Sequence, residues 1–279
     1  MIKIGYNIFG DINNYDVANI IKDNANFIQI FTADPSNFRT TNFNLNQHIK
    51  YFLESNKINL VIHGSFLINL ARHPDDKITK NSIELLKRDL IIAKKINAIG
   101  VIIHMGKDTQ KLGSEEAAKM YVKNLNDILK ITEGIIILET GAGCGTEICS
   151  RFNELASLRN LCIDKSRIKF CIDTCHIYAA GYDLTDVNFV LSLEKYIDNT
   201  LGWKNVCVAH INDSKDKFNS RKDRHADILD GDISNNNINA FMIFINFFIT
   251  RNIPIILETP SDKRTYCEQI NFIINYKTN

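Results

Sequence analysis

The sequence carries little net charge and contains neither a long apolar run nor a glycine-rich phosphate-binding loop. With 33 lysines and arginines against 32 aspartates and glutamates, the formal net charge is +1, so bulk electrostatics does not make the chain a general binder of polyanions. Binding of nucleic acid would need a local basic patch, and the best candidate is Lys215 to Arg224. The longest apolar run, Phe241 to Ile249, contains Asn246 and is far shorter than the roughly 20 residues that span a bilayer. We therefore expect no membrane role.

A disulfide framework is not indicated either. The seven cysteines are an odd number and are scattered between Cys144 and Cys267. Met1 to Phe9 is short, is interrupted by Lys3 and has no cleavage-like end, so it does not resemble a signal peptide. We interpret the cysteines as reduced thiols and expect a soluble intracellular protein, located in the cytoplasm, the nucleus or, for a viral source, the virion.

Linkers rich in proline, glycine or serine are also absent, and so are low-complexity blocks. The 279 residues fit one large domain, because single α/β barrels commonly have about 250 residues. We expect residues 1–279 to form a single domain, which at this length needs no metal or disulfide to build its core. Bound metal ions would then serve chemistry.

What the sequence does contain is a regular alternation of short apolar runs with longer helical patterns. The helical periodicity is clearest over Ile78 to Ile96, Glu115 to Ile131, Glu147 to Leu158 and Asn237 to Ile249. Eight buried-type strands alternating with helices predict parallel strands covered by helices, and a closed (β/α)8 TIM barrel fits eight such units. A doubly wound open sheet is the alternative, but no dinucleotide-binding or P-loop signature favours it. The expected strands are Ile2 to Gly5, Phe27 to Phe31, Asn59 to His63, Ile99 to His104, Ile135 to Glu139, Lys169 to Asp173, Val206 to His210 and Pro254 to Glu258.

Six of these runs end in a side chain that can bind a metal ion. In a parallel barrel the carboxyl ends of all strands face one rim, so the six side chains should converge there. One such residue at the end of a single strand would be interpreted as an ordinary solvated polar side chain. That interpretation does not explain why six of the eight strands end in a potential metal ligand. Burying several carboxylates together is costly unless cations compensate them, and a mixed set of histidines and carboxylates suits Zn²⁺ or Mn²⁺. The six are His63, His104, Glu139, Asp173, His210 and Glu258.

Three further residues extend this set. His176 follows Asp173 by three positions, a spacing that lets both side chains leave one tight turn. Asp223 and His225 are separated by one residue, so in extended chain they point to the same side. Taken alone, Asp223 and His225 would be interpreted as part of a solvated loop. The nine candidates together are enough for about three ions with three or four protein ligands each.

The cysteines near these residues have simpler interpretations. Cys171 and Cys175 flank Asp173, but no second pair completes a structural zinc site, and we expect buried thiols. Cys144 lies in a glycine-rich stretch, Gly141 to Gly145. A nucleophile there would lack an assignable base, so we favour a tight turn or a close backbone approach to a ligand.

The motifs that carry these residues resemble those of the endonuclease IV family of apurinic/apyrimidinic (AP) endonucleases. Cys171 to His176, continuing to Ala179 to Asp183, is similar to the most distinctive signature of that family. His210 to Lys215, followed by Asp223 to His225, is similar to its second signature. Leu138 to Gly143 and Leu257 to Pro260 resemble the remaining strand-end motifs. The similarity extends from about Ile4 to Ile270 and therefore covers nearly the whole chain.

This resemblance implies a site with three zinc ions. By matching position, His63, His104 and Glu139 would hold one ion, and Glu139 would bridge it to a second ion held also by Asp173, His210 and Glu258. His176, Asp223 and His225 would hold the third. The implied reaction is hydrolysis of the phosphodiester 5′ to an abasic site in duplex DNA, which leaves a 3′-hydroxyl and a 5′-deoxyribose phosphate. Related enzymes also trim blocked 3′ ends. Glu139 would be the catalytic residue and no separate protein nucleophile is expected.

Two positions depart from the family pattern and leave recognition of the lesion open. Where the family often places an arginine into the DNA, the chain has Ser36, and Arg39 is near enough to substitute or is simply a solvated arginine. A tyrosine common in the family is replaced by Phe66, which is either an aromatic wedge for the base stack or a core residue. From the basic patch, Lys215 and Arg224 are further candidates for DNA contact.

Two other functions stay open at the level of sequence. A sugar isomerase or epimerase on the same barrel would use a site with one or two metals and would not need His63, His104, His176, Asp223 and His225 together. A DNA-damage binding protein that lost catalysis would not be expected to retain every ligand. We expect a monomer that acts on double-stranded DNA with abasic or 3′-blocked lesions.

Overall fold

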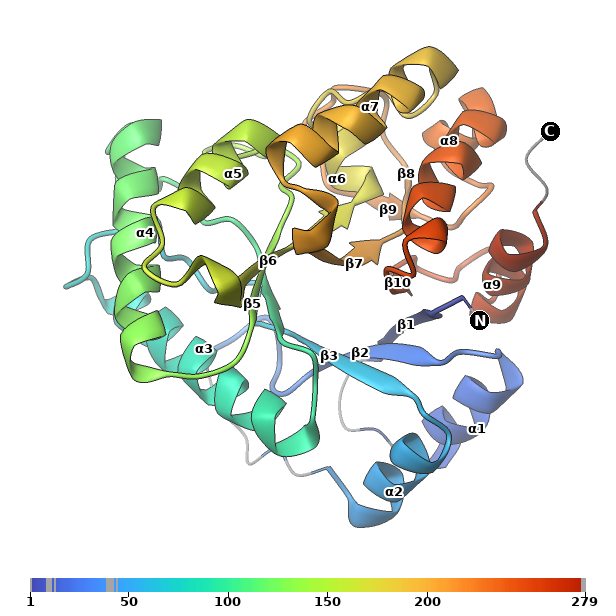
Figure 1. The fold of residues 1–279 in the computed structure, drawn as a ribbon, viewed down its shortest axis with the longest axis horizontal. Coiled ribbons are helices and arrows are strands. Elements are labelled where there is room, and N and C mark those ends of the chain that lie inside the picture. Colours follow the sequence, from blue (N-terminus) through green and yellow to red (C-terminus); the bar gives the residue numbers. More distant parts are fainter. Residues whose placement is uncertain (1, 9–11, 13, 39–42, 44, 277–279) are drawn as a thin grey trace.

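Eight parallel strands close into a barrel whose order is β1-β10-β7-β6-β5-β4-β3-β2, and helices surround it (Figure 1). The computed structural model describes residues 2–8, 12, 14–38, 43 and 45–276. This architecture confirms the predicted (β/α)8 TIM barrel and excludes the open sheet. The barrel strands are β1 (Ile4–Ile8), β2 (Phe27–Phe31), β3 (Asn59–His63), β4 (Val101–Ile103), β5 (Ile136–Glu139), β6 (Ile168–Asp173), β7 (Val206–His210) and β10 (Ile255–Leu257).

The helices follow the strands in the alternation that the sequence predicts. A short antiparallel ribbon, β8 (Asp213–Ser214) with β9 (His225–Ala226), interrupts this alternation after β7. In the described part of the chain, no helix has both the length and the hydropathy needed to cross a membrane. The helices are α1 (Asn14–Lys22), α2 (Gln47–Ser55), α3 (Lys77–Ile96), α4 (Ser114–Ile131), α5 (Phe152–Asn160), α6 (Thr174–Ala179), α7 (Val187–Thr200), α8 (Asp232–Thr250) and α9 (Tyr266–Asn275), with 3-10 turns η1 (Lys165–Arg167) and η2 (Trp203–Asn205).

Three elements differ from the prediction by more than two residues at one end. The first strand was expected over Ile2 to Gly5 but covers Ile4–Ile8. The helix expected from Glu147 begins at Phe152, because the Glu147 carboxylate accepts hydrogen bonds from the backbone amides of Gly143 and Cys144 and closes a turn instead. Conversely, α8 begins five residues before the predicted Asn237, but its backbone is non-helical at Asn237 (φ −161°, ψ 88°), so the predicted start coincides with a kink within α8.

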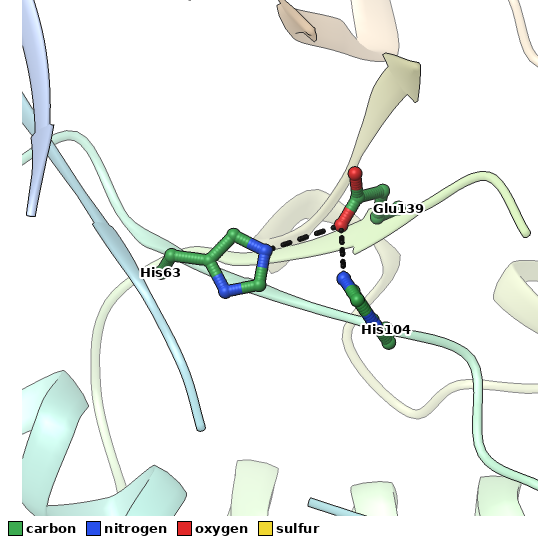
Figure 2. A group of neighbouring side chains, drawn as sticks. All are labelled: His63, His104 and Glu139. Atoms are coloured by element: carbon green, nitrogen blue, oxygen red, sulfur yellow. Dashed lines mark hydrogen bonds and ion pairs between the residues drawn. The ribbon is translucent and has the colours of Figure 1, made fainter. Parts of the chain in front are cut away.

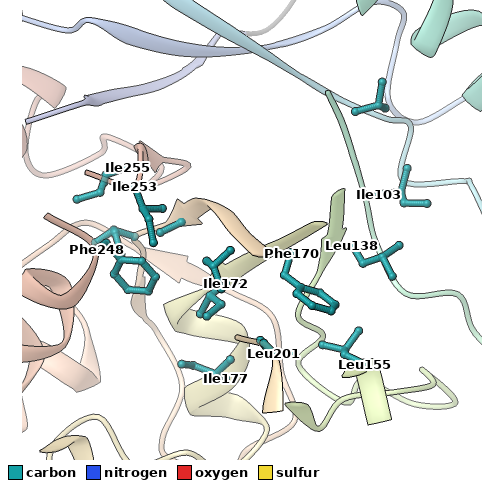
Figure 3. Packing of buried hydrophobic residues seen from close by; sticks show 14 of the residues in the cluster. Ile103, Leu138, Leu155, Phe170, Ile172, Ile177, Leu201, Phe248, Ile253 and Ile255 are labelled. Carbon is teal, nitrogen blue, oxygen red and sulfur yellow. The ribbon is translucent and has the colours of Figure 1, made fainter. Parts of the chain in front are cut away.

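Two apolar layers make up the core. Because side chains alternate along a strand, one set points into the barrel and the other toward the helices. Outward-facing residues such as Phe170 and Ile172 pack against helix residues such as Leu155 and Ile177 (Figure 3). Full burial of each such side chain contributes roughly 1.5–3 kcal/mol. The inner layer, with one residue from each of seven strands, consists of Phe27, Val61, Ile102, Ile137, Cys171, Val208 and Ile256.

Candidate metal centre

The candidate metal centre lies directly above the inner apolar layer. Adding two positions to each residue of that layer gives the next inward-facing side chain of its strand. In six strands that side chain is one of the predicted metal ligands, and in β2 it is Gln29. The alternation of the strands therefore places a polar ring on an apolar floor. The ring consists of Gln29, His63, His104, Glu139, Asp173, His210 and Glu258.

Glu139 occupies the centre of this ring. Its side chain is 1% exposed, and its Oε2 atom lies 3.2 Å from Nε2 of His63 and 3.0 Å from Nε2 of His104 (Figure 2). Its other oxygen, Oε1, lies 2.7 Å from Nδ1 of His210. One carboxylate thus joins two groups of ligands, which is the arrangement expected of a residue that bridges two ions.

Three further ligands, His176, Asp223 and His225, come from outside the barrel strands. Asp173 caps α6 by accepting a hydrogen bond from the amide of His176 (2.9 Å), which sets His176 beside the ring. The β8–β9 ribbon carries Asp223 and His225 to the same rim. Oδ1 of Asp223 lies 3.0 Å from Nε2 of His176 and 3.1 Å from Nε2 of His225.

The buried carboxylate of Asp213 fixes the ribbon in place. It accepts hydrogen bonds from the backbone amides of Ser214, Gly231, Ile233 and Ser234, and so it also caps the start of α8. This interaction explains why α8 begins before the predicted residue. A Cβ atom at Gly231 would lie 2.4 Å from Oδ1 of Asp213, so only glycine allows this contact.

All nine predicted ligands are brought together at one rim. Their donor atoms form three groups in which every donor lies within 4.8 Å of the others: His63, His104 and Glu139; Glu139, Asp173, His210 and Glu258; and His176, Asp223 and His225. The sulfur atoms of Cys171 and Cys175 lie within the same distance of some of these donors. Both residues are buried, and burial raises the pKa of the Cys171 thiol to about 12 and that of Cys175 higher still. Both therefore remain thiols near neutral pH, as the sequence indicated.

Four of the five histidines are oriented by an oxygen acceptor at the ring nitrogen opposite the one that lies nearest a carboxylate. A carbonyl oxygen only accepts, so the contacting nitrogen carries a proton, and the opposite nitrogen is the one that can lose its proton and bind a metal ion. Metal-binding histidines are usually held in this way. The contacts are His63 Nδ1 with the carbonyl oxygen of Gly64 (2.7 Å), His176 Nδ1 with that of Thr140 (2.7 Å), His225 Nδ1 with that of Glu258 (3.2 Å), and His210 Nε2 with Oε1 of Gln29 (2.8 Å).

The electrostatics of the centre also fits cations. Burial by itself lowers the pKa of His225, but the carboxylates of Asp173 and Asp223 outweigh burial and raise that pKa to about 9. Burial raises the pKa of Glu139, but the imidazoles of His210 and His104 outweigh it and hold the pKa well below the ordinary value. Protons on the imidazoles therefore balance the buried carboxylates, and divalent ions can replace those protons.

Two buried nitrogen atoms provide a direct test of whether a metal fits. Nε2 of His176 and Nε2 of His225 make no hydrogen bond within the described residues, although both lie close to Asp223. A buried nitrogen without a partner is costly, and a cation held between these two nitrogens and the carboxylate would satisfy both. Nitrogen and carboxylate donors in this number suit Zn²⁺. The residues present therefore fit divalent metal ions.

A cleft of about 610 Å³ gives access to the centre. Its walls include His104, His176 and Asp223, together with Arg72, Lys107, Cys144 and Phe66. Phe66 is 49% exposed, and its ring centroid lies 5.6 Å from that of His63 and 5.5 Å from that of His104. An aromatic ring thus stands between the metal ligands and solvent.

The other predicted DNA-contact residues lie in different surroundings. Lys215 is exposed at the start of the loop that joins β8 and β9. Arg224, in the same loop, is exposed but forms a bidentate ion pair with Asp216 (2.6 and 2.5 Å). Ser36 is exposed and donates a hydrogen bond to Asp34 (2.6 Å). Arg39 lies outside the described residues.

Two residues of the centre escaped the sequence analysis. Gln29 lies in the ring itself, and its only signal was a single polar residue within the apolar strand Phe27–Phe31. Asn212 is buried, donates a hydrogen bond to Oδ2 of Asp173 (2.6 Å) and accepts one from the amide of Glu258 (2.8 Å). Asn212 lies within the motif His210 to Lys215, which the sequence analysis singled out without giving this residue a role.

Comparison with known proteins places this site in a family. The family profile described as "Xylose isomerase-like TIM barrel" matches residues 17–276. A protein of Aster yellows witches'-broom phytoplasma named "Probable endonuclease 4" is 36% identical over 269 residues, which are 92% of this chain and 89% of the relative. The crystal structure of endonuclease IV from Thermus thermophilus superimposes with a TM-score of 0.79 at 25% identity, covering 98% of this chain and 97% of that one. A D-tagatose 3-epimerase-like protein (TM-score 0.70, 16% identity, 98% and 95% coverage) shares the fold alone.

Proposed function

The chain belongs to the endonuclease IV family of the xylose isomerase-like TIM barrels, and we propose that it is a zinc-dependent AP endonuclease of base excision repair. It hydrolyses the phosphodiester 5′ to an abasic site in duplex DNA and leaves a 3′-hydroxyl and a 5′-deoxyribose phosphate. It also trims blocked 3′ ends. The observation that carries this proposal is the convergence of nine histidine and carboxylate side chains at one rim, with Glu139 joining two of the groups.

In this proposal the three groups of donors hold about three ions. His63 and His104 would bind one, and Asp173, His210 and Glu258 would bind another, with Glu139 shared between the two. The third ion would satisfy the unpartnered nitrogens of His176 and His225 together with Asp223. All ligands come from one chain, which supports a monomer as the active form.

Bound divalent ions supply Lewis acidity, which lowers the pKa of water toward neutrality and offsets the charge of phosphate oxygens. The residues of the chain provide the positions for this chemistry. Glu139 would orient the attacking water and would be shared by two of the ions, because both of its oxygens face the ligand cluster. The apolar floor below, which includes Ile102 and Ile137, keeps water out of the barrel beneath the site. The charged groups therefore act in a preorganised site that is closed from below.

Recognition of the lesion is assigned to the walls of the cleft. Phe66 is half exposed beside the metal ligands, which supports a role as a wedge that fills the gap in the base stack. Lys107, which lines the cleft, together with Lys215, gives a local positive charge for the DNA backbone on a chain with little net charge. Arg72 also lines the cleft, but it is paired with Asp76. Arg224 would first have to leave Asp216, and Arg39 is proposed from sequence alone.

The test is incubation with a duplex that carries one tetrahydrofuran abasic mimic, using the same duplex without the lesion as control. We expect zinc-loaded protein to cut the damaged strand 5′ to the mimic, chelator-treated protein to leave it intact, and added zinc to restore cleavage. A substrate with a 3′-phosphate tests the trimming activity. Binding of the damaged duplex without cleavage would instead support a damage-binding protein. No binding of DNA, with one or two ions per chain, would support a sugar isomerase or epimerase and overturn the proposal.

A further inference from the structure

Gln29 and Asn7 complete the polar ring in the two strands that offer no metal ligand. The sequences of β1 (Ile4–Ile8) and β2 (Phe27–Phe31) contain no histidine, cysteine or acidic residue. Each strand contributes one buried amide instead, and the two residues are direct partners in the register of β1 with β2. Gln29 is fully buried and Asn7 is 5% exposed. Buried amides of this kind are stable only when their donors and acceptors are satisfied.

Gln29 reaches across the barrel mouth to two ligands of the same group. Its Oε1 atom accepts a hydrogen bond from Nε2 of His210 (2.8 Å). Its Nε2 atom donates one hydrogen bond to Oε1 of Glu258 (2.6 Å) and another to Oδ1 of Asn7 (3.2 Å). The amide oxygen and both donor hydrogens are therefore used, and the two donor hydrogens let this uncharged side chain serve Glu258 and Asn7 while its oxygen serves His210.

These contacts determine which atoms of His210 and Glu258 face the other ligands. With the proton of His210 held on Nε2, its Nδ1 atom turns to the cluster and lies 2.7 Å from Oε1 of Glu139 and 3.1 Å from Oε2 of Glu258. His63, His176 and His225 show the opposite orientation, with Nε2 toward the cluster and Nδ1 held by a backbone carbonyl. Among these four histidines, His210 is the one whose outer nitrogen is held by a side chain, that of Gln29.

We propose that Gln29, braced by Asn7, is a positioning residue that makes His210 bind its metal ion through Nδ1 and makes Glu258 present Oε2. The inference rests on the proposed function only in requiring that the site bind divalent ions. Removing a residue that orients metal ligands typically weakens metal binding by about 10- to 100-fold. The loss should be confined to the ion at Asp173, His210 and Glu258.

The experiment compares three substitutions in the full-length protein. Gln29→Leu keeps the approximate size of the side chain and removes its three hydrogen bonds, while Asn7→Ala removes only the brace. Gln269→Leu is the matched control, because Gln269 is also buried and contacts Ile228 and Arg264 rather than a metal ligand. Zinc affinity is measured by competition with a chromophoric chelator, and the protonated nitrogen of His210 is identified by ¹⁵N NMR of the zinc-loaded protein.

We expect Gln29→Leu to lower the affinity for one of the bound zinc ions by about 10- to 100-fold and to change the ¹⁵N NMR signals of the His210 imidazole. Asn7→Ala should act in the same direction and more weakly, and it decides the question if Gln29→Leu does not fold. Gln269→Leu should lower thermal stability and leave zinc affinity unchanged. Unchanged zinc affinity and His210 signals in the Gln29 and Asn7 variants, or an equal loss in Gln269→Leu, would overturn the proposal. These readouts do not use DNA, so wild-type protein that binds zinc but leaves abasic DNA intact would refute the proposed function and not this inference.

Discussion

Replacement of Glu139 by glutamine perturbs the centre at the one residue that two groups of ligands share. The side chain is 1% exposed and has no room to turn toward solvent. Glutamine preserves its size but replaces one carboxylate oxygen by an NH₂ group. That group donates hydrogen bonds and cannot bind a metal ion, and it would face the lone pairs of either His63 and His104 or His210. The negative charge that balances these imidazoles is lost at the same time.

The expected loss can be worked out from the positions of the ligands. Without Glu139 the first group retains two of its donors and the second retains three, while the group of His176, Asp223 and His225 keeps all its donors. Zinc content should therefore fall from about three ions per chain to about two, because only the first group is left with fewer than three donors. Loss of one preorganised electrostatic contact commonly costs about 10²–10³ in rate. Since Glu139 serves two groups, we expect cleavage to fall by about 10³-fold or more, which corresponds to roughly 4 kcal/mol of transition-state stabilisation.

The assay measures single-turnover cleavage of the abasic duplex together with zinc content by elemental analysis. Glu84→Gln is the matched control, because Glu84 is 71% exposed on α3 and pairs only with Lys87 in the described contacts. Circular dichroism monitors the fold of both variants. A Glu139→Gln protein that retained its full zinc content and cut the duplex within about tenfold of the wild-type rate would refute the bridging role.

Three further predictions concern the third ion, the lesion and pH. The double substitution Asp223→Ala with His225→Ala should release about one zinc ion per chain, and an unchanged zinc content would contradict a shared ion. Phe66→Ala should weaken binding to abasic duplex by about tenfold and to intact duplex less, whereas equal losses in a filter-binding assay would favour simple packing. Burial raises the pKa of Asp89 from 3.8 to about 6, so the folded state holds this proton more tightly and the contribution of Asp89 to stability is lost as pH rises through that range. Asparagine mimics the protonated acid and does not titrate. In urea unfolding, the free energy of unfolding of Asp89→Asn should therefore rise relative to that of the wild type by up to roughly 3 kcal/mol between pH 4 and pH 7. A difference between the two proteins that does not change with pH would contradict the raised pKa.

The barrel and the strand-borne half of the site follow from rules that operate within one strand. An apolar run such as Asn59–His63 is buried on both faces, and the period of two fixes which of its residues points inward. For this reason the side chains at the ends of several strands could be placed at one rim before their contacts were known. The start of α8 could not be predicted in this way, because the cap that extends it comes from Asp213, eighteen residues before Gly231.

Residues that act through contacts distant in sequence were harder to recognise. Gln29 serves His210 and Glu258, which lie 181 and 229 residues away, so its role appears only when the barrel closes. The interpretation of Phe66 stayed open for a related reason, since exposure of a loop residue depends on the surrounding loops. Arg224 was selected for its charge, and its ion pair with Asp216 depends on how the loop between β8 and β9 turns.

The central claim is tested most directly by counting the metal ions that the purified, folded protein retains. Elemental analysis after exhaustive dialysis against zinc-free buffer should find about three zinc ions per chain. A protein that remains folded and holds no more than one ion, even after incubation with excess zinc, would contradict the account.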